Sequence, residues 1–256
     1  MKYLKILALF LCCQTSLAQT VQKPVEEKTE EQKKKDWENF QKAIEFRIHN
    51  DWAWLERYEG DNQKLPAPAI GERRVVFFGN SITENWINTD SAFFKSKNYI
   101  NRGIGGQTTP QMLVRFREDV INLKPELVII LAGINDIAGN TGPSKIENVA
   151  GNIFSMAELA RVNHIKVILS SVLPASAIPW RPGIDPVASI IKLNLMLKAY
   201  AEKNQLIYVD YYSATVNADR GFKKELTIDG VHPNLAGYKV MEPLAERAIT
   251  EAFKQK

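Results

Sequence analysis

Cysteine is scarce in this sequence, with two among 256 residues, Cys12 and Cys13. Both lie in an N-terminal stretch in which two lysines precede an apolar run (residues 6–13) and small residues lead to Ala18. This order of a charged, an apolar and a small-residue region predicts a secretory signal peptide, residues 1–18, cleaved after Ala18. The mature chain would then contain no thiol, which excludes disulfide bonds and cysteine metal sites even in an oxidising compartment.

Long hydrophobic runs are also missing. The apolar run at residues 6–13 is too short to cross a bilayer, so we expect no transmembrane segment and an exported protein, periplasmic or secreted. Lipid attachment at Cys12 or Cys13 is a weaker alternative, because Phe10 and Leu11 are bulky where a lipoprotein signal usually has small residues.

A strong excess of charge of one sign is absent as well. The chain has 33 Lys and Arg against 29 Asp and Glu, and removal of Lys2 and Lys5 with the signal peptide would leave a net charge of about +2. Such a balance argues against a nucleic-acid surface. The chain has no P-loop, and the glycines between residues 103 and 106 lack the spacing of a dinucleotide-binding motif.

Composition divides the mature chain into three parts. Residues 19–36 are almost wholly Glu, Lys, Gln and Thr, with too little apolar surface to fold, and we expect a charged tether there. Residues 37–72 are expected to form an N-terminal helix and lead-in, whose apolar stripe from Trp37 to Leu55 packs against the domain. Residues 73–256 form the main domain, since the 238 residues after Ala18 suffice for one α/β domain with a sizeable core.

Apolar runs alternate with helical patterns throughout the main domain. Strands are expected at residues 75–78, 99–100, 127–131, 166–171 and 206–210, and helices at 143–162, 187–203 and 235–253. This alternation implies right-handed βαβ crossovers, and hence an α/β fold with a central parallel sheet covered by helices on both faces.

Polar residues and glycines follow these strands at the points where the strands end. Ser81 follows the first strand beside a helix N-terminus, Gly106 lies in a Gly-rich turn after the second strand, and Asn135 follows the third. Ligands bind at this edge of open α/β sheets. Asp229 and His232 lie three residues apart on one short loop near the C-terminus. Taken singly, each position also has a structural interpretation, such as a helix cap at Ser81 or a tight turn at Gly106.

Together these residues have the composition of an acyl-transfer site. A histidine, whose ordinary pKa is near ~6.5, is suited to take the proton of the Ser81 hydroxyl at neutral pH. Asp229 would orient His232 and stabilise the imidazolium that forms. The N–H groups of Ser81 and Gly106 and the side-chain amide of Asn135 are the candidate donors to the negatively charged oxygen of the intermediate.

Four short blocks, in this order, resemble those of the SGNH hydrolases, also called GDSL-type esterases and lipases: Gly79-Asn80-Ser81-Ile82-Thr83, Asn101 to Gly106, Gly133-Ile134-Asn135-Asp136 and Asp229-Gly230-Val231-His232-Pro233. The resemblance covers residue 73 to the end, and the segments 54–58 and 101–109 look most like the branch related to platelet-activating-factor acetylhydrolase subunits. One departure is visible, because Asn80 stands where the family usually has Asp. Asn makes similar bonds to the backbone of a turn, so we expect little loss of activity.

The resemblance implies a fold, a mechanism and the absence of a cofactor. The fold would be a flavodoxin-like three-layer α/β/α sandwich without metal or organic cofactor. Ser81 would be the nucleophile, Asp229 and His232 the acid and the base, and Ser81, Gly106 and Asn135 the oxyanion hole.

The function expected from these residues is an exported serine esterase that hydrolyses short-chain esters, above all acetyl esters of carbohydrates. The loop at residues 172–186 holds four prolines and is long enough to line a cleft, with Trp180 and Arg181 as candidate substrate-binding residues. The alternatives are a lysophospholipase or short-chain lipid acylhydrolase, and a non-catalytic binding domain on the same fold. The expected partner is the ester substrate and not nucleic acid, and the sequence leaves the oligomeric state open.

Overall fold

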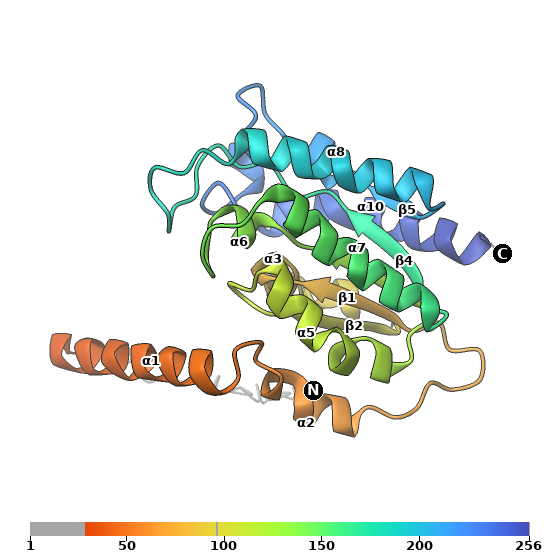
Figure 1. The fold of residues 1–256 in the computed structure, drawn as a ribbon, viewed down its shortest axis with the longest axis horizontal. Helices are drawn as coiled ribbons and strands as arrows, with labels where there is room; N and C mark the ends of the chain where they lie inside the picture. Colours follow the sequence, from red (N-terminus) through yellow and green to blue (C-terminus); the bar gives the residue numbers. More distant parts are fainter. Residues whose placement is uncertain (1–28, 96, 256) are drawn as a thin grey trace, which may run out of the picture. The chain divides into compact units, whose positions relative to one another are not determined.

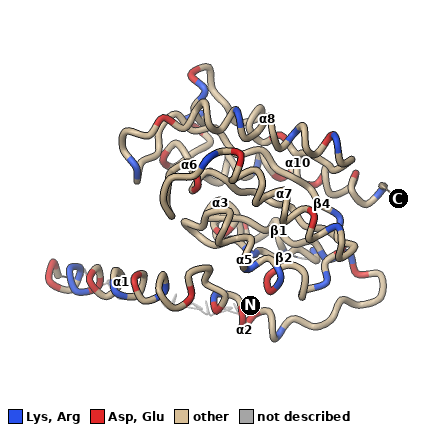
Figure 2. Tube along the Cα trace, viewed as in Figure 1, with Lys and Arg blue, Asp and Glu red and all other residues tan. Residues whose placement is uncertain are grey.

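The computed structural model describes residues 29–95 and 97–255. Contacts divide the chain into two units, Met1–Ile44 and Glu45–Lys256. The expected signal peptide and most of the expected tether lie outside the described residues. Helix α1 (Glu30–Asn50) begins within the segment expected to be a charged tether, and Figure 2 shows both acidic and basic residues along it. Across the described ranges, no helix is long and apolar enough to cross a membrane.

The second unit is built on five parallel strands in the order β2-β1-β3-β4-β5 (Figure 1). The strands are β1 (Val75–Gly79), β2 (Tyr99–Gly103), β3 (Leu127–Leu131), β4 (Lys166–Ser170) and β5 (Ile207–Val209). This is the flavodoxin-like order, and the expected fold class is confirmed. Gly79 pairs with Gly103 on one side and with Leu131 on the other, so three neighbouring strands end level with one another.

Helices cover both faces of the sheet, with α5, α7 and α8 in a row on one face and α3 and α10 on the other (Figure 1). The helices after the first are α2 (Glu56–Lys64), α3 (Ser81–Thr89), α4 (Ser91–Phe94), α5 (Thr109–Asp119), α6 (Ile134–Ile137), α7 (Ile146–Val162), α8 (Val187–Lys203), α9 (Tyr211–Thr215) and α10 (Leu235–Lys254), with 3-10 turns η1 (Ile121–Leu123) and η2 (Lys224–Leu226). The result is the expected three-layer sandwich.

The core fixes the helix that begins at Ser81. All five residues of β1 are buried, as are those of β3, because both strands are covered on each face. Trp86 of α3 is 1% exposed, and its ring centroid lies 5.0 Å from that of Phe93 and 5.3 Å from that of Tyr238. These stacked rings hold α3 between α4 and α10, so the start of α3 has a fixed place at the sheet edge.

The part of the apolar stripe that lies in the second unit is not buried against the domain as expected. Helix α1 ends at Asn50, and the carboxylate of Asp51 accepts hydrogen bonds from the N–H groups of Leu55 (2.8 Å) and Glu56 (3.0 Å). Asp51 thereby starts α2 and breaks the helical period. Three residues of the stripe in this unit, Ile48, Trp52 and Leu55, are 49%, 38% and 40% exposed, so the prediction was wrong for them.

Candidate active site

Ser81 is the first residue of α3, directly after the carboxyl end of β1. A Cβ atom at Gly79 would lie 2.0 Å from Thr83 Oγ1 and 2.8 Å from the carbonyl oxygen of Leu131, so only glycine allows the helix to start this close to the sheet. Asn80 caps α3, because its Oδ1 accepts a hydrogen bond from Ile82 N–H at 3.1 Å, as expected for an Asn in place of Asp. The hydroxyl of Ser81 is thus presented at a helix N-terminus, where the partial positive charge favours an anion.

Asp229 and His232 lie on the loop between η2 and α10 and are bonded to each other. Asp229 Oδ2 lies 2.8 Å from His232 Nδ1, and Asp229 Oδ1 accepts bonds from the N–H groups of Val231 (3.0 Å) and His232 (2.8 Å). Thr227 Oγ1 donates to the carbonyl oxygen of His232 at 2.7 Å and closes the loop. The histidine ring is therefore held in one orientation by backbone and side-chain bonds.

The other ring nitrogen of His232 faces the serine. Ser81 Oγ lies 2.9 Å from His232 Nε2, although the two residues are 151 positions apart in the sequence. Partial burial would raise the pKa of Asp229, but the hydrogen bonds from His232 and Val231 outweigh it and lower this pKa. An ionised Asp229 keeps the proton on Nδ1, which leaves Nε2 free to accept the Ser81 hydroxyl proton.

Helix α10 holds the histidine loop against α3. Asn234 caps α10, its Oδ1 accepting from Gly237 N–H at 3.0 Å, and one turn later Tyr238 OH donates to the carbonyl oxygen of Ile82 at 2.8 Å. Tyr238 is fully buried. Because Ile82 directly follows Ser81, this bond ties the helix after the histidine to the helix that carries the serine.

The two other predicted oxyanion donors meet at the turn after β2. Gly106 has φ +76°, a left-handed conformation that favours glycine. Asn135 is 1% exposed, and its Nδ2 donates one N–H to the carbonyl oxygen of Gln107 at 2.9 Å, which leaves its second amide N–H. The turn lies beside the serine, since a Cβ atom at Gly105 would be 3.8 Å from Ser81 Cβ.

Trp180 and Arg181, the predicted substrate-binding residues, lie beside this turn and the histidine. Trp180 Nε1 donates to Asn140 Oδ1 at 3.0 Å, and the Trp180 ring centroid lies 5.7 Å from that of His232. Arg181 Nη2 donates to the carbonyl oxygen of Gly139 at 3.3 Å. The indole is 37% exposed, so part of it faces solvent next to the imidazole.

Sequence reasoning missed Asn140, which links two parts of the candidate site. Its Nδ2 donates to the carbonyl oxygen of Gly106 at 3.0 Å, while its Oδ1 accepts from Trp180. No local pattern could have identified it, because both partners are distant in sequence.

Arg115, which is fully buried in α5, was missed as well. It donates to the carbonyl oxygens of Gly79 (2.9 Å) and Arg102 (3.0 Å), at the ends of β1 and β2, and pairs with Asp119 at 2.8 Å. The sequence could have indicated this ion pair, because an Arg and an Asp stand four residues apart on the apolar face of a helix, alongside Phe116.

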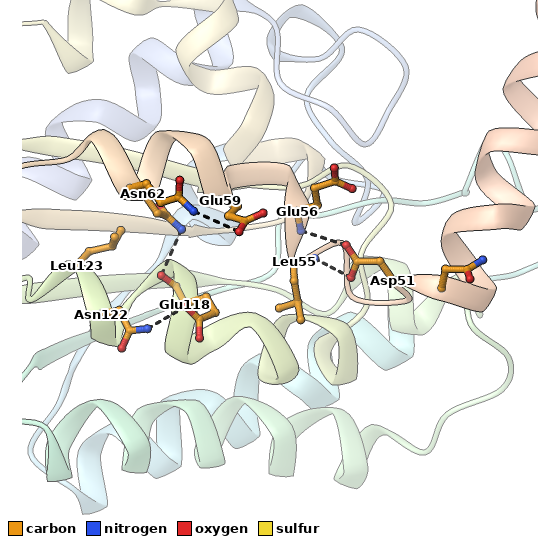
Figure 3. A pocket seen from close by; sticks show the side chains of 10 residues that line it. Asp51, Leu55, Glu56, Glu59, Asn62, Glu118, Asn122 and Leu123 are labelled. Carbon is orange, nitrogen blue, oxygen red and sulfur yellow. Dashed lines mark hydrogen bonds between the residues drawn. The ribbon is translucent and has the colours of Figure 1, made fainter.

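A cavity of about 710 Å³ lies elsewhere, between α2 and the α5–η1 region (Figure 3). Its lining includes Asp51, Leu55, Glu56, Asn62 and Glu118, and none of Ser81, Asp229 and His232 belongs to it. Among the described residues, no group of three or more His, Cys, Asp or Glu is arranged to hold a metal ion. The candidate active site is the strand-end site around Ser81 and not this cavity.

Two solved structures are similar to this chain over most of its length. One is a candidate acylhydrolase from Bacteroides fragilis, 55% identical, with a TM-score of 0.78 over 79% of this chain and 98% of that chain. The other is a GDSL-like lipase from Bacteroides thetaiotaomicron, 50% identical, with a TM-score of 0.77 over 79% of this chain and 100% of that chain.

Curated relatives are more distant. An uncharacterized lipoprotein of Bacillus subtilis, YqeF, is 33% identical over 122 residues, 41% of this chain, which spans only 50% of that relative's length. An acetylxylan esterase of Geobacillus stearothermophilus is 25% identical over 153 residues, 56% of this chain and 67% of the relative. The model of the GDSL-like Lipase/Acylhydrolase family matches residues 77–240, which include the carboxyl end of β1 and the loop of Asp229 and His232. On this match, the chain belongs to the GDSL-like lipase/acylhydrolase family of ester-hydrolysing enzymes.

Proposed function

We propose that this protein is a serine esterase that removes short acyl groups, above all acetyl, from carbohydrates. The observation that carries the proposal is the pair of hydrogen bonds in series, Ser81 Oγ to His232 Nε2 at 2.9 Å and His232 Nδ1 to Asp229 Oδ2 at 2.8 Å. A nucleophile, a base and a group that orients the base are arranged in this way for acyl transfer.

The first half of the reaction forms an acyl-enzyme. Ser81 Oγ attacks the ester carbonyl carbon while its proton passes to His232 Nε2, and Asp229 stabilises the resulting imidazolium. The tetrahedral intermediate collapses when the bond to the alcohol oxygen breaks, and His232 gives its proton to that oxygen. The alcohol, here a sugar hydroxyl, leaves and the acyl group stays on Ser81.

Water completes the cycle by the same steps. It loses a proton to His232 Nε2 and attacks the acyl carbon. The second intermediate collapses when the bond between the acyl carbon and Ser81 Oγ breaks, His232 returns its proton to Oγ, and the carboxylic acid leaves. In both halves, the negative oxygen would be bound by the N–H groups of Ser81 and Gly106 and by the free amide N–H of Asn135. Each such donor contributes about 3 to 4 kcal/mol to the transition state.

The carbohydrate substrate is supported by the surroundings of His232. Trp180 presents a partly exposed indole 5.7 Å from the imidazole, where it is available to stack on the face of a sugar whose ester lies at Ser81. Arg181, on the same loop, offers hydrogen-bond donors to sugar oxygens. The likeness to an acetylxylan esterase, at 25% identity, favours the same substrate class.

Export and domain boundaries belong to the same proposal. In this proposal the signal peptide is cleaved after Ala18, and a charged tether (19–36), an N-terminal helix and lead-in (37–72) and a catalytic domain (73–256) follow. Export would place the active site outside the cytoplasm, where polymeric carbohydrate esters are encountered. Fractionation of cells, followed by N-terminal sequencing of the mature protein, tests this part. Protein retained in the cytoplasm with residues 1–18 intact would contradict it.

The serine mechanism is tested with p-nitrophenyl esters from acetyl to longer acyl chains. We expect cleavage of the short esters and a loss of at least ~10³-fold in kcat/KM for Ser81→Ala. Ser91→Ala is the matched control, because Ser91 also begins a helix but lies outside the site, and its activity should stay within about two-fold of wild type. Equal activity of wild type and Ser81→Ala would refute the mechanism.

The substrate class is tested by comparing an acetylated xylooligosaccharide with a lysophospholipid. We expect the higher kcat/KM on the oligosaccharide, and Trp180→Ala should raise KM for it while leaving KM for p-nitrophenyl acetate almost unchanged. A strong preference for the lysophospholipid would overturn the carbohydrate assignment and leave the serine mechanism intact.

A further inference from the structure

Residues 51–64, here called the α2 segment, hold both ends of the turn that carries Gly106. The segment lies outside the matched family region, which begins at residue 77. At one end of the turn, Tyr58 OH donates to the carbonyl oxygen of Gly103 at 2.5 Å. At the other end, the carbonyl oxygen of Ala53 accepts from Gln107 Nε2 at 2.7 Å. The turn between Gly103 and Gln107 is therefore fixed from outside the sheet.

The middle of the turn is held through the helix of the nucleophile. Glu84, three residues after Ser81, accepts from Gly105 N–H with its Oε2 at 2.7 Å. Its Oε1 lies 3.3 Å from Nη2 of Arg57, a residue of α2. Arg57 thus restrains the carboxylate that restrains Gly105, the neighbour of the proposed oxyanion donor Gly106.

Gln107 connects the α2 segment to the second proposed donor. Its side chain is 3% exposed and lies between Arg115 Nε, which donates to Oε1 at 2.5 Å, and the carbonyl oxygen of Ala53. Its own carbonyl oxygen accepts from Asn135 Nδ2 at 2.9 Å. A displacement of Gln107 would shift both the Gly106 N–H and the Asn135 amide.

The far end of the α2 segment is fastened to α5 and β2. Asn62 Nδ2 donates to Asp119 Oδ1 at 2.8 Å and to the carbonyl oxygen of Glu118 at 3.3 Å, and Figure 3 shows Asn62 facing Glu118 across the edge of the cavity. Asn62 Oδ1 accepts from Arg102 Nε at 2.9 Å. The segment is therefore anchored at both its ends.

We propose that the α2 segment is a positioning element of the oxyanion hole, with Tyr58 and Arg57 as its positioning residues and with Gln107 as the residue of the turn that Ala53 holds. The proposal rests on the proposed function, because it assumes that Gly106 and Asn135 bind the oxyanion. Loss of one donor costs about 10²- to 10³-fold in kcat, and a donor displaced by a fraction of an ångström loses part of this. Such a loss appears in kcat and not in KM, because the oxyanion exists only in the transition state and intermediate.

The first test compares Tyr58→Phe with Tyr99→Phe. Tyr99 begins β2 and donates its hydroxyl to Glu246 Oε2 at 3.0 Å, whereas Tyr58 bonds to Gly103, where β2 ends. Each variant loses one tyrosine hydrogen bond, at opposite ends of the same strand. On p-nitrophenyl acetate we expect Tyr58→Phe to lower kcat about 10-fold with KM unchanged, and Tyr99→Phe to stay within about two-fold.

A second pair, Arg57→Gln and Arg73→Gln, removes surface guanidinium groups and leaves the core intact. Arg57 faces Glu84 at 3.3 Å. Arg73 faces Glu126 at 4.0 Å, and both precede the strands β1 and β3, at the opposite edge of the sheet from the turn. We expect kcat to fall about three-fold for Arg57→Gln alone. If Tyr58→Phe fails to fold, the arginine pair tests the positioning role of the α2 segment. Equal kcat for the two arginine variants would then overturn the proposal.

Titration of Ser81 with a fluorophosphonate distinguishes failure of the positioning role from failure of the serine mechanism. Complete labelling of Tyr58→Phe together with a lowered kcat supports the positioning role, because every molecule then carries a competent serine. Complete labelling with equal kcat in Tyr58→Phe and Tyr99→Phe overturns it and leaves the serine mechanism standing. Absence of labelling in the wild type, or labelling of Ser81→Ala, overturns the proposed function itself.

Discussion

The stability of the protein should depend on the ionisation of Asp136, which follows Asn135. Its side chain is 3% exposed and accepts from the Thr109 N–H at 3.0 Å and the Thr109 hydroxyl at 2.6 Å. Burial raises the pKa of Asp136 from 3.8 to about 6, although the bonds from Thr109 act in the opposite direction. The folded state therefore holds the Asp136 proton more tightly than the unfolded state does.

The sign of the pH dependence follows from this difference. The stabilisation is fully present below pH 3.8 and is lost as the pH rises through about 6, because the ionised carboxylate is disfavoured by burial. At about 1.36 kcal/mol per pKa unit, the full contribution is about 3 kcal/mol. About 2 kcal/mol of it should disappear between pH 4.5 and pH 7.

Urea unfolding of wild type and Asp136→Asn, followed by tryptophan fluorescence at pH 4.5, 5.5 and 7, measures this contribution. The free energy of unfolding of wild type minus that of Asp136→Asn should fall by about 2 kcal/mol from pH 4.5 to pH 7, since other titrating groups cancel in the difference. Asp219→Asn, which removes an exposed carboxylate, is the control against which the pH dependence for Asp136→Asn is compared. A flat difference for Asp136→Asn would show that the bonds from Thr109 offset burial, and a rising one that they outweigh it; either would refute the raised pKa.

Three further predictions concern the site and its supports. Asn135→Ala should lower kcat by about 10² to 10³, and an unchanged kcat would remove Asn135 from the oxyanion hole. Asp229→Asn should lower kcat by about 10⁴ in steady-state assays, because the wrong tautomer of the histidine is then favoured; a loss below ten-fold would argue against this role. Gly103→Ala places a Cβ 2.1 Å from Glu84 N and should lower the free energy of unfolding, measured by thermal unfolding, by about 1 to 3 kcal/mol. Gly151→Ala, inside α7 with open space around the new Cβ, should raise it by about 0.5 to 1 kcal/mol. Similar effects of the two substitutions would contradict the packing argument.

Long apolar runs were the most predictable part of the fold. The strand expected at 127–131 and the helix expected at 187–203 agree with β3 and α8 residue for residue, because each is specified by its own apolar pattern. Strand β2 was expected to end at Ile100 but continues to Gly103. Its polar residues Asn101 and Arg102 are buried by partners from elsewhere, Thr83 and Asn62, and no local pattern contains that information.

The residues of the candidate site were likewise predictable only where a local sequence pattern marks them. Ser81, Asn135 and the pair Asp229 and His232 were identifiable because each stands at a strand end or on a short loop next to a recognisable break. Asn140 and Gln107 were not, since their roles depend on contacts that exist only after the chain has folded. The packing predicted for Ile48, Trp52 and Leu55 was wrong for a related reason. The apolar period in the sequence continues past Asp51, but the side chain of Asp51 starts a new helix.

The separation of Ser81 and His232 by 151 positions has a consequence for biosynthesis. A ribosome completes the segment with the serine before the segment with the histidine, and the loop of His232 is held in place by α10, which follows this loop in the sequence. On the proposed mechanism, a growing chain would thus contain the hydroxyl without its base and would not hydrolyse esters. On the proposed mechanism, esterase activity would therefore appear only after the loop of His232 has packed beside Ser81, and its appearance would report that folding step.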